Sequence, residues 1–181
     1  MLTLEQYKKM NQSFRKELIF HMGCDSGFYS EFNNMILAII YCLLADIKFT
    51  MYSADANFKY KDGWNDYFLP FCEEVNDSFH HKFNTRAEDP WFDMHGLDRW
   101  RYIWWKLHHK QTYLTFDLFC KFRMASFSRL HLSEPKNGME GGLRDIARQI
   151  VNMIYRFNSH TTEEIEKLIK QLHLPAKYIG F

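Results

Sequence analysis

The chain has 181 residues, and its 23 lysines and arginines against 22 aspartates and glutamates give a formal net charge of +1. This length suffices for one well-buried core and is too short for two domains of ordinary size. The balance of charge excludes a bulk positive field of the kind that draws proteins to nucleic acid or to anionic membranes. We therefore expect one domain or one lobe of a two-lobed protein, in which an anionic ligand would need a local site.

The cysteines and the apolar runs indicate the compartment. The four cysteines are well separated, form no C-x-x-C pair and stand among apolar neighbours: Cys24, Cys42, Cys72 and Cys120. This pattern is typical of reduced, buried thiols in a cytosolic protein. The first residues lack the apolar core of a signal peptide, and the longest apolar run, 35–45, is too short to span a bilayer. We predict a cytoplasmic protein, with peripheral attachment to a membrane left open.

The first clear unit is a strand, a loop, a helix and a second strand. Residues 17–22 are an apolar run, 23–30 contain glycines and turn formers, and 31–46 are apolar nearly all round. This pattern predicts a buried strand and a buried helix with Ser30 as its N-cap. The run 47–53 predicts a second strand, parallel to the first across a right-handed crossover. We therefore expect an α/β fold, a Rossmann-like parallel sheet with helices on both faces.

An aromatic-rich segment follows at about residues 54–132, and it holds all five tryptophans of the chain. Short helices are predicted at 64–75 and 97–109, where large apolar residues recur at intervals of three and four. A further helix is predicted after 115–117. We interpret the segment as a mainly helical insertion into the α/β fold.

The remainder predicts a loop, two helices and a last strand. Residues 133–142 are rich in proline, glycine and other turn formers, which indicates a flexible connection. Amphipathic periodicity then predicts a helix pair at 143–172. Pro175 breaks the second helix, and 177–181 predict a buried strand with no turn or polar tail behind it. We interpret 1–181 as a single α/β lobe, the front half of something larger.

The loop between the first strand and the first helix is the best candidate for a binding site. It leaves the carboxyl end of a strand and enters the amino end of a helix, whose exposed N–H groups favour anions. Gly23 and Gly27 would let the backbone approach such a ligand, but the spacing matches neither a dinucleotide fingerprint nor a Walker loop. Taken alone, the loop is better explained by Asp25 and Ser30 capping the turn while Glu31 favours the helix dipole.

Other catalytic patterns are missing from the sequence. The nine histidines show no H-E-x-x-H or two-histidine-one-carboxylate spacing, so we predict no metal. The aromatic residues allow two interpretations, because exposed rings stack on sugars or bases whereas buried rings supply contact area. We expect burial for most of them. Trp64, Trp91 and Tyr102 have polar neighbours, which suits carbohydrate better than nucleic acid.

Three segments, 18–22, 27–34 and 175–181, resemble parts of one enzyme family. They are similar to the amino-terminal half of fucosyltransferase-like glycosyltransferases with the two-lobed GT-B architecture. In that family a helix pair leads into a strand that ends in a His-hydrophobic-Arg-Arg-x-Asp-like motif, and the present sequence stops before it. The resemblance implies the acceptor-side lobe of an enzyme that transfers fucose from GDP-fucose to a glycan, without metal or other cofactor.

The resemblance also implies roles for individual residues. Glu31 would be the general base for an acceptor hydroxyl, with Asn33 and Asn34 as hydrogen-bonding positioners. The other expected substrate contacts are loop residues and one tryptophan: Asp25, Ser26, Gly27 and Trp64. The family's arginines, which neutralise the nucleotide diphosphate leaving group, belong to the part that is missing. The lobe alone is therefore expected to show little transfer.

Two rival functions remain. The aromatic insertion and the terminal helices would also suit a non-catalytic module that binds a protein partner or closes a homodimer. A single-stranded nucleic-acid binder with stacked aromatics is the weaker alternative. A parallel sheet with Glu31 and Asn33 in an open cleft would favour the transferase, whereas a helical bundle with both on a flat surface would oppose it.

Overall fold

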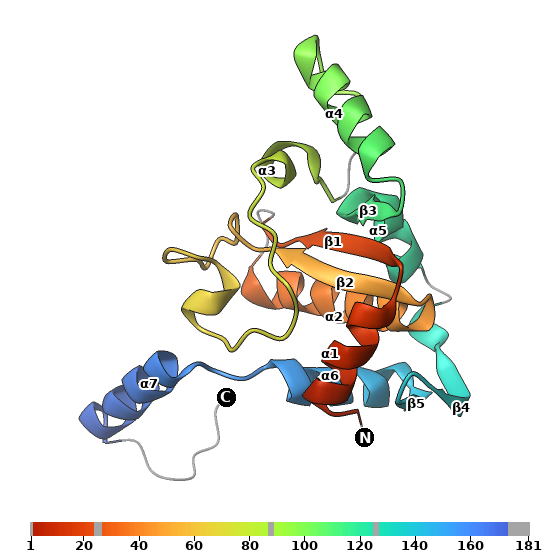
Figure 1. Ribbon diagram of the computed structural model, residues 1–181. Helices are drawn as coiled ribbons and strands as arrows, with labels where there is room; N and C mark the ends of the chain where they lie inside the picture. The colour runs from red at the N-terminus through yellow and green to blue at the C-terminus, as the bar shows by residue number, and fades with distance from the viewer. Residues whose placement is uncertain (1, 24–26, 87–88, 125–126, 174–181) are drawn as a thin grey trace.

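The computed structural model describes residues 2–23, 27–86, 89–124 and 127–173 (Figure 1). The chain has a mixed α/β fold around a three-stranded sheet in the order β2-β1-β3. The strands β1 (Lys16–His21) and β2 (Ile47–Tyr52) pair in parallel along their whole length. A short third strand, β3 (Thr112–Leu114), pairs in parallel with the other edge of β1. The predicted parallel sheet is therefore confirmed.

One face of the sheet packs against α2 (Phe28–Leu44), the crossover helix between β1 and β2. The helix α5 (Thr115–Arg123) follows β3 and contacts both α2 and the strands. The side chains of Leu18, Phe20 and Phe49 belong to this core and are fully buried. The N-cap of α2 is Gly27, so the predicted cap at Ser30 is wrong: Ser30 lies inside the first turn.

The opposite face is covered by residues of the aromatic segment. The strands contribute Ile19, Tyr52 and Leu114 to a second core, because successive residues of a strand point to opposite faces. The helices α3 (Phe79–Phe83) and α4 (Leu97–His108) pack aromatic side chains against them, including those of Phe79, Phe83 and Trp105. In Figure 1, α4 extends away from the sheet.

The aromatic segment is less separate from the sheet than predicted. It contains β3 and α5, so the third strand of the sheet lies inside 54–132.

The helix predicted at 64–75 is wrong. After the short 3-10 helix η1 (Trp64–Asp66) the chain makes a turn and two isolated β-bridges, and the N–H of Val75 donates to the carbonyl of Met51 at 2.8 Å. Pro70 lacks an N–H and cannot continue a helix. The helices predicted at 97–109 and after 115–117 are confirmed as α4 and α5.

The predicted loop at 133–142 is a β-hairpin. Strands β4 (His131–Lys136) and β5 (Met139–Gly142) pair antiparallel. Asn137 and Gly138 make the turn, with φ of 51° and 77°. An Asn-Gly pair is a strong signal for such a turn because both residues tolerate positive φ.

The helix pair predicted at 143–172 is present as α6 (Leu143–Ile154) and α7 (Ser159–Gln171). The apolar face of α6 packs on α2, whereas α7 buries none of its residues. A second 3-10 helix, η2 (Phe127–Arg129), precedes the hairpin. The predicted final strand at 177–181 lies outside the described residues.

The cysteines differ in exposure more than the sequence indicates. Of the three that are described, Cys42 is buried, Cys72 is half-buried and Cys120 is exposed, and all are free. Cys120 is exposed because it lies on α5 opposite the buried Leu118 and Phe122. Across the described segments, no helix combines the length and apolarity that crossing a membrane requires.

The outer edge of β2 is closed in part by α1 (Leu4–Ser13). The buried side chain of Asn11 donates to the carbonyl of Phe49 at 2.9 Å and accepts from the N–H of the same residue at 2.7 Å. These two bonds satisfy backbone groups that an edge strand leaves open.

We expect Asn11→Ala to lower the free energy of unfolding by about 2 kcal/mol, because it leaves the buried N–H and carbonyl of Phe49 without partners. Urea denaturation measures the loss. The matched control is Gln12→Ala, at an exposed position of the same helix, which is expected to change stability little. Equal losses in both variants would show that Asn11 does not act through the edge of β2.

Candidate functional site at the carboxyl edge of the sheet

Polar side chains gather where β1 and β2 end. His21 is the last residue of β1, and its Nε2 lies 3.0 Å from Oδ2 of Asp55, which follows β2. His81 of α3 reaches the same carboxylate, with its Nδ1 2.9 Å from each oxygen. The carboxyl ends of parallel strands are where α/β folds bind ligands. We call His21, Glu31, Asp55, His81 and Arg86 the carboxyl-edge cluster.

His21 is held on both sides of its ring. Its Nδ1 donates to the carbonyl of Asn84 at 2.7 Å, because a carbonyl can only accept. Its Nε2 faces the Asp55 carboxylate, and the ring lies against Tyr52 with centroids 5.4 Å apart. With both nitrogens engaged, His21 positions Asp55 and does not itself contact a ligand.

His81 differs from His21 because its ring is exposed and, in the described part of the chain, only one of its nitrogens is engaged. Its side chain is 71% exposed, and Nδ1 donates to Asp55. Among the residues that the structure describes, none forms a hydrogen bond with its Nε2. A carboxylate that holds Nδ1–H fixes the tautomer and leaves Nε2 to accept a proton. The His81–Asp55 pair therefore has the geometry of a general base.

Glu31 lies in the first turn of α2 and is 1% exposed. Its carboxylate accepts from the N–H of Gly23 at 3.3 Å and forms an ion pair with Arg86. Burial raises the pKa of Glu31 from an ordinary 4.5 to about 7, against the opposing effects of the Gly23 N–H and nearby His21. Glu31 thus titrates near neutrality but presents almost no surface to a substrate.

Gly23 is required by close contact between backbones. A Cβ at this position would lie 2.5 Å from Cβ of Asp55 and 2.7 Å from its carbonyl oxygen. Because Gly23 has no side chain, its backbone can contact that of Asp55. In this position the N–H of Gly23 donates a hydrogen bond to the carboxylate of Glu31. The close approach at Gly23 in this structure is to Asp55 of the same chain, and the approach to a ligand stays a prediction.

Asn84 supports the cluster from within the protein. Its amide donates to the carbonyl of Ile19 at 2.8 Å and accepts from the N–H of Thr115 at 2.7 Å, which ties β1 to the start of α5. The same amide nitrogen lies 3.3 Å from Nδ1 of His80, which therefore accepts. Burial lowers the pKa of His80 from 6.5 to about 4, so the ring is neutral at pH 7.

The structure separates the residues predicted to bind substrate. Asn33 is exposed and lines a groove with residues of α5 and η2, whereas Glu31 contacts Gly23 and Arg86. The two therefore do not share an open cleft. Asn34 is buried, and its Oδ1 has no hydrogen-bond partner in the described part of the chain. Gly27 is the exposed N-cap of α2, and the loop positions 25 and 26, predicted as contacts through Asp25 and Ser26, are outside the described residues.

Trp64 does not present a surface for stacking on a sugar. It is 1% exposed, and its ring stacks on Phe68 and Phe32 at centroid distances of 4.2 and 6.2 Å. Its indole N–H donates to the carbonyl of Leu69 at 3.2 Å. The expected contact with substrate is replaced by a role in the core.

The sequence predictions missed His21, Asp55, His81 and Arg86. Two of them carried a usable signal, because His21 ends the first predicted strand and Asp55 follows the end of the second. His81 and Arg86 lie in the aromatic segment and carry no local signal. Their contacts depend on how that segment folds back over the sheet.

The chain matches no family model, no curated protein and no solved structure. Within residues 2–173, apart from the gaps given above, no three histidine, cysteine, aspartate or glutamate side chains are arranged to hold a metal ion. The contacts within the carboxyl-edge cluster are hydrogen bonds and ion pairs.

Proposed function

We propose that this chain is the amino-terminal, acceptor-side lobe of a GT-B glycosyltransferase that transfers fucose from GDP-fucose to a glycan acceptor. The observation that supports it is the His81–Asp55 pair, oriented as a general base at the carboxyl edge of a parallel sheet. The resemblance at 18–22, 27–34 and 175–181 supplies the reaction class.

The proposed reaction is direct displacement. The acceptor hydroxyl oxygen bonds to the anomeric carbon of fucose, the bond from that carbon to the diphosphate breaks, and Nε2 of His81 takes the hydroxyl proton. Asp55 stabilises the resulting imidazolium, and His21 and Asn84 hold Asp55 and its surroundings in place. Glu31 becomes a positioning residue in this proposal, because it is buried against Arg86 and Gly23.

Donor binding is assigned mainly to a carboxy-terminal lobe. In the resembled family, arginines of that lobe neutralise the diphosphate, and the present sequence does not include them. The proposed partners of this lobe are the glycan acceptor, the nucleotide sugar and the second lobe, and nucleic acid is not among them. The isolated polypeptide should therefore bind acceptor without turning over GDP-fucose at a useful rate.

The test is a titration of the full chain with a panel of oligosaccharides, followed through the histidine ring signals in NMR spectra. We expect a fucosyl-acceptor glycan to shift the His81 signals, and His81→Ala to weaken binding about tenfold through the lost hydrogen bond. His108→Ala, at an exposed histidine of α4, is the control and should bind as the unaltered chain does. If none of the oligosaccharides shifts the His81 signals, the proposed acceptor site is contradicted. Rapid transfer of fucose by this polypeptide would contradict its assignment as a single lobe.

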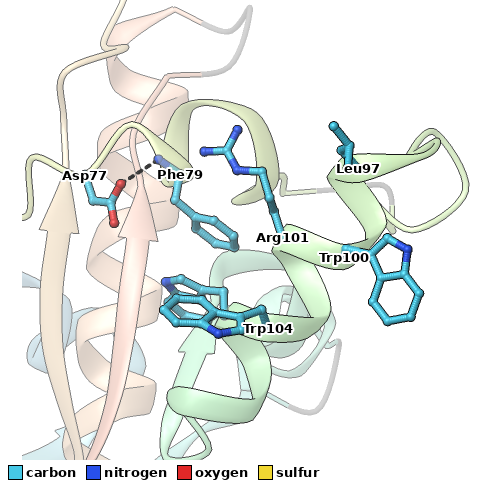
Figure 2. Close-up of a pocket in the computed structure, with 7 residues that line it drawn as sticks. Asp77, Phe79, Leu97, Trp100, Arg101 and Trp104 are labelled. Carbon is cyan, nitrogen blue, oxygen red and sulfur yellow. Dashed lines mark hydrogen bonds between the residues drawn. The ribbon is translucent and has the colours of Figure 1, made fainter.

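A second candidate function, protein interaction, is favoured by the exposed face of α4. Leu97, Trp100 and Trp104 are 81%, 71% and 61% exposed and recur at helical spacing. Figure 2 shows Leu97 and Trp100 on the outer side of α4, with Phe79 and Trp104 nearer the body of the protein. These residues line an open hollow of about 520 Å³. A Trp100→Ser chain that sediments and binds glycans as the unaltered chain does would oppose this alternative.

A further inference from the structure

Arg86 has one edge of its guanidinium without an acceptor. The side chain is 9% exposed, and Nη2 pairs with Oε1 of Glu31. Nη1 is buried and has no hydrogen-bond partner among the residues described. Buried arginine donors are ordinarily satisfied, so an unfilled Nη1 in a rigid side chain indicates a missing acceptor.

The orientation of this guanidinium is fixed by its surroundings. Its Cζ lies 5.8 Å from the ring centroid of Phe119 on α5, and Glu31 holds the Nη2 side. A planar guanidinium that is held in this way offers its remaining donors at fixed angles. Such geometry suits the paired oxygens of a phosphate or carboxylate.

A second cation lies on the same helix as Phe119. Burial, and after it the charge of Arg123 at the end of α5, lowers the pKa of Arg86. Two neighbouring guanidiniums repel unless an anion offsets them, and Glu31 is one carboxylate with a pKa near neutrality. Arg123 also lines an open groove of about 280 Å³ together with Asn33 and Ser128.

The amino end of α2 adds to the attraction for an anion. This 17-residue helix has Gly27 as its N-cap, and no side chain of the described residues forms a cap hydrogen bond there. The N–H groups of a first turn and the helix dipole both favour negative charge. Glu31 is in that first turn, so the ion pair brings Arg86 to this end of α2.

We infer that Arg86 and Arg123 bind a phosphate group at the amino-terminal end of α2, beside the carboxyl-edge cluster. The ligand is free inorganic phosphate or the phosphate of an organic ester, and both would use the same guanidinium donors. This inference rests on the two arginines and is independent of the proposed transferase activity.

Calorimetric titration of the full chain tests it, with inorganic phosphate in one arm and glucose 1-phosphate in the other, at constant ionic strength kept with chloride. Saturable binding is expected in at least one arm, and Arg123→Met should weaken it about tenfold or more, because a charge-assisted bond is lost. Arg148→Met, at a 68% exposed arginine of α6, is the control and should leave the affinity unchanged.

Arg86→Met alone would bury Glu31 without its partner, so the informative variant is Glu31→Gln/Arg86→Met, with folding checked by circular dichroism. It should abolish the saturable binding. Equal affinity in both arms would identify free phosphate as the ligand, and a clear preference for the ester would identify a phosphorylated molecule. No saturable binding in either arm, or equal losses in Arg123→Met and Arg148→Met, would overturn the inference. The transferase proposal is judged separately by the His81 signals.

Discussion

In a Glu31→Gln variant the free energy of unfolding is expected to increase as pH rises from about 4 to 7. In the unaltered protein the free energy of unfolding should stay nearly constant over the same range. Glu31 has a pKa of about 7 when folded and an ordinary value of 4.5. Between these values the folded chain keeps a proton that the unfolded chain loses, so this group lowers stability as pH rises. The full difference corresponds to about 3 kcal/mol, and glutamine removes it.

Urea denaturation at several pH values measures this slope. The absolute stability of Glu31→Gln will also reflect the altered contact with Arg86, so the slope is the quantity that tests the prediction. Glu166→Gln, at an exposed position of α7, is the control and should keep the flat profile. A Glu31→Gln variant that also stays flat would show that the buried carboxylate does not hold its proton.

The second large effect, of opposite sign, is expected from His80→Gln. The folded pKa of His80 is about 4 against an ordinary 6.5. As pH falls through this range the unfolded chain takes up a proton and the folded chain does not, so stability is lost toward acid by about 3 kcal/mol. Removing His80 leaves the contribution of Glu31 unopposed by this histidine, and stability should then fall as pH rises. Glutamine keeps an oxygen that can accept from Asn84.

The double variant Glu31→Gln/His80→Gln separates this explanation from general damage. Each single variant should change the slope of stability against pH in its own direction. The double variant should return close to the slope of the unaltered protein, because the two opposing contributions are removed together. His160→Gln, at an exposed position of α7, serves as the control for loss of a histidine. If His80→Gln and Glu31→Gln change the slope of the free energy of unfolding against pH in the same direction, these two groups do not act in opposite directions and the explanation fails.

Local patterns in the sequence predicted the elements that have strong periodicity. The runs at 17–22 and 47–53 and the helix between them correspond to β1, β2 and α2, and the helix pair at 143–172 corresponds to α6 and α7. Short elements escaped prediction. β3 has three residues, too few for alternation to be recognised, and it belongs to the sheet only because β1 offers it an edge.

Two of the local errors have identifiable causes. The helix predicted at 64–75 ignored Pro70, which has no N–H and lies where the chain turns back toward the edge of β2. The hairpin at 133–142 was taken for a loop although its Asn137-Gly138 pair is a signal for a tight turn. Both corrections were available from turn chemistry.

The sequence by itself determined where β1, β2, their crossover helix and the carboxyl ends of these two strands would be, because these depend on backbone preferences and burial over a few neighbouring residues. Only the tertiary structure decided which polar side chains meet there. His21, Asp55 and His81 come from three separate segments, and Arg86 pairs with Glu31 across 55 positions. The same folding buried Trp64 and separated Glu31 from Asn33. Contacts of this kind depend on how distant segments pack, and no short window of sequence contains that information.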